Sequence, residues 1–168
     1  EGVAEQYGVT IATQAAVDRR AANFFALLRD EPLPAAPGVR EIVAAARRDP
    51  EFKLAIATSG QQAKQFPVIE GTGLRLEWFD VVVTGDEVDR KKPDPQIYLR
   101  TAERLGLSPS RCIVFEDAPA GVAAAKAAGM TCVAVTTSAP REQLQAADLI
   151  VESLAELDLL QLKALLAR

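Results

Sequence analysis

Short, continuously apolar runs alternate with longer segments in which apolar residues recur at helical spacing. The runs predict strands at residues 53–57, 80–84, 111–115, 131–135 and 148–151. Continuous apolar runs, unlike alternating ones, indicate strands that are buried on both faces. Such strands are typical of a parallel sheet that is covered by helices on two sides.

The segments between these runs predict helices. The predicted helices cover residues 37–50, 61–71, 94–106, 119–129, 141–147 and 154–167. In the first, apolar residues follow the i, i+3, i+4, i+7 spacing from Val39, and Asp49 with Pro50 ends it. Pro67 weakens the second helix, and Gly106 and Gly129 end two of the others. This rhythm predicts an α/β fold, a three-layer Rossmann-like parallel sheet with right-handed connections.

The N-terminal part does not follow this rhythm. Residues 10–29 predict a separate helix, and residues 29–38, with three prolines, predict a linker. We therefore expect a helical element at residues 1–35 and an α/β core at residues 36–168.

Composition limits the classes of protein to which the chain can belong. Its 168 residues suffice for one sizeable core, and 49% hydrophobic with 25% charged residues is typical of a globular protein. A net charge of −4 argues against a nucleic-acid partner, which normally requires a basic surface. No apolar run is long enough to span a membrane, and no apolar signal-peptide core is present, so we expect a cytoplasmic protein.

Two residue types narrow the possible chemistry. The sequence contains no histidine, which excludes histidine-based acid–base catalysis, serine-type triads and histidine metal sites. Cys112 and Cys132 lie in predicted strands, at a spacing that matches no zinc or redox motif. We expect both cysteines to be small buried hydrophobes.

Polar residues follow three of the predicted strands. Residues 58–60 (Thr-Ser-Gly) follow the first strand, and residues 84–86 (Thr-Gly-Asp) follow the second, with residues 91–93 (Lys-Lys-Pro) further along. Glu116 and Asp117 follow the third strand. Ligands of such sheets bind outside the carboxyl ends of the strands, so these groups are expected at one edge.

Each group has a role in phosphoryl transfer. The backbone after Thr58, through Ser59 and Gly60, leads into a helix whose N-terminus favours a phosphate. A lysine neutralises phosphoryl oxygens as a point charge, and two adjacent carboxylates suit Mg²⁺. Taken singly, these features are also typical of a helix cap, a solvated turn and a favourable helix dipole. Their joint arrangement predicts a phosphoryl-transfer site.

Three stretches of the sequence resemble motifs of a known protein family. "LAIATSG", "VVVTGDEVDRKKPDPQIYL" and "CIVFEDAPAGVAAAKAAGM" resemble motifs two, three and four of the haloacid dehalogenase superfamily, in its phosphatase and beta-phosphoglucomutase-like branch. The resemblance covers residues 37–151 as the core, and residues 1–35 resemble the last part of a helical cap.

The resemblance implies a role for each matching residue. Thr58 would hydrogen-bond the phosphoryl group, assisted by the backbones of Ser59 and Gly60. Lys92 would neutralise the phosphate and the nucleophile. Asp117 would bind Mg²⁺. Glu116 would be a further Mg²⁺ ligand, or it would contact a ligand without touching the ion. Lys91 occupies a position where the family usually has glycine.

The first motif of the family is missing. It is an Asp-x-Asp after an opening strand, whose first aspartate forms an aspartyl-phosphate and whose second acts as acid and base. Before Thr58 the aspartates are Asp18, Asp30 and Asp49, and none follows a predicted strand. In the family the missing strand lies mid-sheet, between the strands that carry Thr58 and Asp117. We therefore expect an apolar slot and an N-terminally truncated enzyme.

These observations predict a Mg²⁺-dependent phosphate-monoester hydrolase that acts on a small phosphorylated metabolite through an aspartyl-phosphate. A phosphomutase, and a catalytically silent module that binds Mg²⁺ and a phosphorylated ligand, remain open as alternatives. A phospho-receiver domain is excluded because its acid pair comes first along the chain and its lysine last. A dehalogenase is disfavoured because that chemistry needs no Mg²⁺-binding acid pair.

Overall fold

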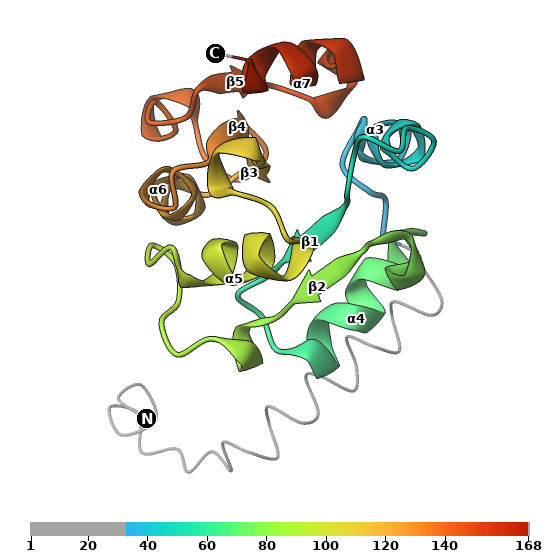
Figure 1. Ribbon diagram of the computed structural model, residues 1–168, viewed down its shortest axis with the longest axis vertical. Helices are drawn as coiled ribbons and strands as arrows, with labels where there is room; N and C mark the ends of the chain where they lie inside the picture. Colours follow the sequence, from blue (N-terminus) through green and yellow to red (C-terminus); the bar gives the residue numbers. More distant parts are fainter. Residues whose placement is uncertain (1–32, 168) are drawn as a thin grey trace, which may run out of the picture.

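The computed structural model describes residues 33–167. The predicted helix at 10–29 and nearly all of the predicted cap segment at 1–35 lie outside these residues. The strands are β1 (Ala55–Ala57), β2 (Val81–Val83), β3 (Ile113–Glu116), β4 (Thr131–Val135) and β5 (Leu149–Val151). The helices are α3 (Val39–Ala46), α4 (Gln62–Gly71), α5 (Gln96–Leu105), α6 (Pro119–Ala127) and α7 (Leu159–Leu166) (Figure 1).

The strands form two parallel sheets. One has the order β1-β2, with Ala57 opposite Val83, and the other has the order β3-β4-β5, with Glu116 opposite Ala134. The parallel α/β fold class is confirmed. Within residues 33–167, β1 pairs only with β2 and β3 pairs only with β4, so each of these strands has one edge without a partner strand. An apolar cavity lies between these two edges.

Helices cover both faces of the sheets. Helix α5 packs on β1 and β2, and α6 packs on β3 and β4, with the two helices in contact. Helices α3 and α7 contact each other and lie on the other side (Figure 1). This arrangement explains why the strand sequences are continuously apolar.

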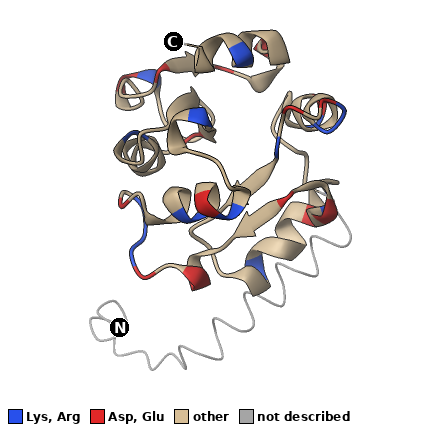
Figure 2. Ribbon diagram, in the orientation of Figure 1, with Lys and Arg blue, Asp and Glu red and all other residues tan. Residues whose placement is uncertain are grey.

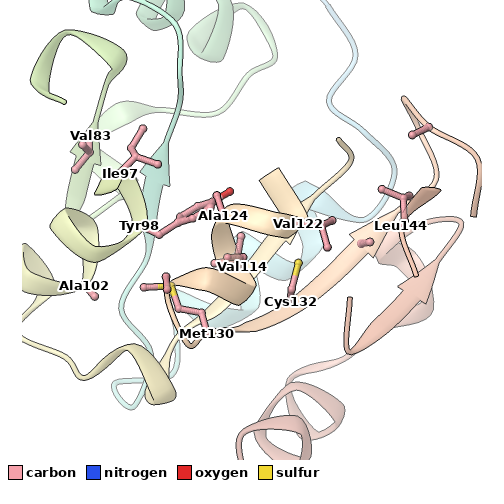
Figure 3. Close-up of a cluster of buried hydrophobic side chains, with 14 residues drawn as sticks. Val83, Ile97, Tyr98, Ala102, Val114, Val122, Ala124, Met130, Cys132 and Leu144 are labelled. Atoms are coloured by element: carbon pink, nitrogen blue, oxygen red, sulfur yellow. The ribbon is translucent and has the colours of Figure 1, made fainter. Parts of the chain in front are cut away.

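Two clusters of buried side chains form the core. The larger lies under α5 and α6 (Figure 3), and its fully buried members include Val83, Ile97, Val122, Cys132 and Leu144. The second lies on the face toward α3 and α7, and its buried members are Ile42, Val133, Val135, Val151, Leu154 and Leu162. Neighbouring residues of β4 therefore belong to opposite clusters, as a strand buried on both faces requires.

Two predicted helices are wrong in extent. In place of a helix at 141–147 the structure has a short 3-10 turn at Arg141–Gln143, after which Leu144 is fully buried. A segment this short gains little from helix formation, so burial of Leu144 decides its conformation. The predicted helix at 154–167 is split in two, because the side chains of Ser153 and Asp158 each cap a new helical start.

Two smaller differences concern Pro67 and Glu116. Helix α4 continues through Pro67, where the sequence predicted only a weakened helix. Glu116 is the last residue of β3 rather than the first residue after it. Its side chain is therefore held by strand geometry, which affects the site described below.

Both cysteines are free, as expected. Cys132 is fully buried in β4, and burial raises the pKa of its thiol to about 12. The prediction for Cys112 was only partly right, because this residue lies just before β3 and is half-buried. Both thiols stay protonated at neutral pH, since burial also raises the pKa of Cys112.

Acidic and basic side chains are interspersed over the helices and loops (Figure 2). None of the helices within residues 33–167 combines the length and the apolar character that crossing a membrane would require.

Candidate active site

Lys92 lies where the carboxyl ends of the two sheets meet. Its Nζ pairs with Oε1 of Glu116, the last residue of β3, and lies 3.5 Å from the carbonyl oxygen of Ala57, the last residue of β1. The Lys92 and Glu116 side chains are only 15% and 9% exposed. Lys91, by contrast, is exposed. The structure thus brings Lys92, and not Lys91, to the point where β1 and β3 end.

Glu116 is held on both carboxylate oxygens. Oε1 accepts a hydrogen bond of 2.5 Å from the Tyr98 hydroxyl as well as the Lys92 contact. Oε2 faces the backbone N–H groups of Asp117 and Ala118, at 3.2 and 3.4 Å. A Cβ added at Gly121 would lie 2.0 Å from the carboxyl carbon, so only glycine leaves room for this side chain. Glu116 therefore orients its neighbours in this structure.

Tyr98 is a site residue that sequence reasoning missed. It is 4% exposed, and the Lys92 Nζ lies 4.7 Å from the centre of its ring, within cation–π range. Burial and the negative charge of Glu116 raise the pKa of the Tyr98 hydroxyl far above its usual value, so the hydroxyl stays protonated and donates to Glu116. Its position in "KPDPQIY" was the available signal, but an aromatic residue on a buried helix face is usually core.

Asp117 has one oxygen held by hydroxyl groups. Its Oδ2 accepts hydrogen bonds from Thr137 Oγ1, at 3.3 Å, and from Ser138 Oγ. No hydrogen bond to Oδ1 is formed by any group in the described part of the chain. Thr137 and Ser138 follow β4, so the rule used for the other three strands would have found them.

The loop after β1 is fixed by the loop after β2. Thr58 Oγ1 accepts a hydrogen bond of 3.2 Å from the Gly60 amide, and the Gly60 carbonyl accepts one of 2.9 Å from the Gly85 amide. A Cβ at Gly85 would lie 2.2 Å from the Ser59 carbonyl oxygen, so this close approach requires glycine. The predicted phosphate loop is therefore rigidly placed at the carboxyl end of β1.

One predicted anion-binding group is already occupied. The Gln62 amide, the first of α4, donates a hydrogen bond of 2.7 Å to Asp86 Oδ2. This carboxylate caps the helix by the same charge preference that would favour a phosphate. Of the other phosphate donors predicted here, the Gly60 amide already donates to Thr58 Oγ1, which leaves the Thr58 hydroxyl and the Ser59 amide.

Of the two acids, Asp117 has the carboxylate oxygen that a hard cation could bind, whereas both oxygens of Glu116 are engaged. Over residues 33–167, no three or more carboxylate or thiol side chains are grouped so that they alone could hold a metal ion. Mg²⁺ commonly uses one or two carboxylates and completes its shell with waters and substrate phosphate. Asp117, with an oxygen free of hydrogen bonds within residues 33–167, has the donor chemistry for this role.

Comparison with known proteins agrees with this geometry. The family model described as haloacid dehalogenase-like hydrolase matches residues 3–129. The chain is 43% identical over 103 residues to validoxylamine A 7'-phosphate phosphatase of Streptomyces hygroscopicus, covering 61% of this chain and 48% of that protein. It is 45% identical over 94 residues to a phosphorylated carbohydrates phosphatase of Thermotoga maritima, covering 56% and 43%.

A solved structure resembles the fold closely. It is a CbbY mutant from Rhodobacter sphaeroides in complex with xylulose-(1,5)bisphosphate, with a TM-score of 0.76 and 31% identity. The match covers 89% of this chain and 68% of that one. Of the two curated relatives named above, by contrast, the chain spans only about half the length.

Proposed function

The chain belongs to the haloacid dehalogenase-like hydrolases, and on this premise we propose that its site serves a Mg²⁺-dependent phosphatase for small phosphorylated sugars. The observation that carries the proposal is the cluster of Lys92, Glu116 and Asp117 at the carboxyl ends of β1 and β3. A buried lysine beside two acids suits charge neutralisation of a phosphate monoester. The named activities of the relatives support sugar phosphates as the substrate class.

We assign the roles as follows. Lys92 neutralises the phosphoryl oxygens, and Thr58 with the backbone of Ser59 and Gly60 hydrogen-bonds them. Asp117 holds the cation, and Glu116 orients Lys92. Bound Mg²⁺ supplies neutralisation of phosphate charge.

The proposed reaction also needs a nucleophilic aspartate. Its carboxylate oxygen would form a bond to phosphorus while the ester oxygen leaves with a proton, and water would then hydrolyse the aspartyl-phosphate. Within residues 33–167, Asp49 pairs with Lys163 and Asp86 caps α4, so neither is placed for this role. We assign the nucleophile to a segment outside the described residues, and we assign residues 1–35 to the cap.

The test is hydrolysis of p-nitrophenyl phosphate with Mg²⁺ by this chain and by a form extended upstream to include an Asp-x-Asp. We expect activity only in the extended form. Lys92→Ala in that form should abolish most of the activity, whereas Lys91→Ala, which changes the exposed neighbour, should not. Equal losses in the two variants would contradict the role of Lys92.

A second candidate is a non-catalytic module that binds Mg²⁺ and a phosphorylated ligand. It is favoured by the fact that Asp49 pairs with Lys163 and Asp86 caps α4, so neither offers a nucleophile. Phosphate and Mg²⁺ binding by calorimetry, with no turnover in either form of the chain, would select it. Conversion of a sugar phosphate to its isomer without phosphate release would instead select a phosphomutase.

A further inference from the structure

Two hydroxyl groups of the segment after β4 lie against one oxygen of Asp117. Thr137 Oγ1 donates to Asp117 Oδ2 at 3.3 Å, and Ser138 Oγ donates to the same oxygen. Oδ1 accepts no hydrogen bond from any group within residues 33–167. One oxygen of the carboxylate is thus held by the protein, and the other is left open.

The backbone and the side chain of Asp117 are fixed by different parts of the chain. Asp117 directly follows β3, and its amide donates to Glu116 Oε2 at 3.2 Å. That bond does not fix the carboxylate, because the last torsion of an aspartate side chain is broad and roughly two-fold. Two donors on one oxygen select one orientation. The direction of the carboxylate therefore depends on the loop after β4, the strand that pairs with β3.

The loop that carries the two hydroxyls, residues 136–141, is anchored on both sides of them. The Thr136 amide donates to the Val151 carbonyl at 3.1 Å, and the Arg141 guanidinium donates to a second carbonyl of β5 at 3.2 Å. Between these anchors, Ala139 is buried in the larger core cluster. The hydroxyls are therefore carried by a fixed backbone, although their side chains are exposed.

The contacts differ from those that loop hydroxyls usually make. Serine and threonine hydroxyls in loops usually bond to backbone groups a few residues away. These two instead reach a carboxylate that lies 20 and 21 residues earlier in the chain. A half-buried carboxylate is hydrated without such partners, so the contacts add direction rather than solvation.

We propose that Thr137 and Ser138 are positioning residues for the cation site, which hold Oδ2 of Asp117 and leave Oδ1 to bind Mg²⁺. This inference rests on the proposed function, in which Asp117 holds the cation, and it adds two residues to that site. A ligand that is oriented in advance loses less freedom when the ion binds. Groups that hydrogen-bond a metal ligand typically contribute about 10- to 100-fold to metal affinity.

The test is Mg²⁺ binding measured by calorimetry without substrate, on the form extended upstream to include an Asp-x-Asp. The variants are Thr137→Val, Ser138→Ala and the double variant. We expect the double variant to bind Mg²⁺ about 10- to 100-fold more weakly. Ser138→Ala should lose more affinity than Thr137→Val, because the Thr137 bond of 3.3 Å is longer than hydroxyl donors usually make.

Two control variants accompany these. Ser138→Thr keeps the hydroxyl and should keep most of the affinity. Ser110→Ala removes an exposed hydroxyl that lies 3.3 Å from Ser108 Oγ, before β3, and should leave Mg²⁺ binding unchanged.

Two further measurements separate positioning from a general effect on the fold. Without Mg²⁺, the double variant should bind inorganic phosphate as the parent does, because the proposed phosphate groups are Thr58 and Lys92. Its urea midpoint without Mg²⁺ should shift no more than that of Ser110→Ala. Loss of phosphate binding in parallel with Mg²⁺ binding, or a clearly lower midpoint, would show a structural role and overturn the inference.

The remaining outcomes distinguish the inference from the proposed function. Unchanged Mg²⁺ affinity in the double variant, beside a lost affinity in Asp117→Asn, would overturn the inference and leave the proposed function standing. A loss as large in Ser138→Thr as in Ser138→Ala would overturn it too, because the hydroxyl would not be the group that matters. Absence of Mg²⁺ binding in the parent, or unchanged affinity in Asp117→Asn, would reject the metal assignment and the inference together.

Discussion

The pairing of Lys92 with Glu116 yields a quantitative prediction about folding stability. We consider Lys92→Met, Glu116→Gln and the double variant. Each single change leaves a partly buried charge without its main partner, because the two side chains are 15% and 9% exposed. The double change removes both charges and keeps similar volumes.

The magnitude follows from the environment of the pair. Two unit charges at about 4 Å attract by about 4 kcal/mol at an effective dielectric constant of about 20. Breaking a buried pair from one side typically costs about 3–5 kcal/mol. Here Tyr98 and two backbone amides still support Glu116 when Lys92 is lost, so the cost is reduced. We expect each single variant to lose about 2–3 kcal/mol, with a coupling of about 2 kcal/mol between the two sites.

The assay is urea unfolding followed by circular dichroism for the four proteins of the cycle. A matched control is the pair Arg75–Glu77, whose side chains are 64% and 65% exposed. Its coupling should lie at about 0–1 kcal/mol, because water screens exposed charges. The buried and exposed pairs are compared in one protein under one set of conditions.

A coupling below about 0.5 kcal/mol for Lys92 and Glu116 would refute the reasoning. It would mean that the two side chains are solvated independently in solution. The assignment of Glu116 as the group that orients Lys92 would then have to be given up.

Three further predictions concern neighbouring features. Gly121→Ala should destabilise the fold by about 1–3 kcal/mol in urea unfolding, and by less in a Glu116→Ala background, because the new Cβ would lie 2.0 Å from that carboxyl group. The Thr84 amide lowers the pKa of Glu87 below its ordinary 4.5, more than burial raises it. Glu87 therefore contributes stability that is full above about pH 4.5 and is lost as pH falls through the lowered pKa, so Glu87→Gln should flatten the acid side of a stability–pH curve. Asp117→Asn should abolish Mg²⁺ binding measured by calorimetry, and unchanged affinity would contradict the metal assignment.

Local patterns predicted the elements well where one physical cause dominated. The apolar run at 131–135 is β4 in full, since its residues pack into both core clusters. Helix α5 ends at Gly106, which adopts the left-handed conformation that the sequence indicated. The segment at 141–147 was predicted wrongly because a buried Leu144, a tertiary contact, determines its shape.

The sequence predicted which charged residues lie at the candidate site, but it did not predict which of them contact one another. Strand direction placed residues 91–93, Glu116 and Asp117 at one edge of the sheet, and the family resemblance singled out Lys92. The structure brings Lys92 and Glu116 into contact. The Tyr98 hydrogen bond depends on which face of α5 meets β3, and that is decided by packing between distant segments. The capture of the Gln62 amide by Asp86 likewise joins two loops that are far apart in the sequence.

Strand edges are the property that hydrophobic patterns do not encode. A continuous apolar run indicates that both faces of a strand are buried. At the two edges of the strand only backbone groups form hydrogen bonds, and these groups are the same in every residue other than proline. The sequences of β1 and β3 are therefore those of strands inside a sheet, although each has only one partner strand within residues 33–167. The two sheets are nevertheless linked at their carboxyl ends, where Lys92 contacts both Ala57 of β1 and Glu116 of β3, and Lys53 before β1 reaches the Leu105 carbonyl of α5. Because α5 also packs on β1 and β2 and contacts α6, the helices that cover the two sheets are joined to each other as well.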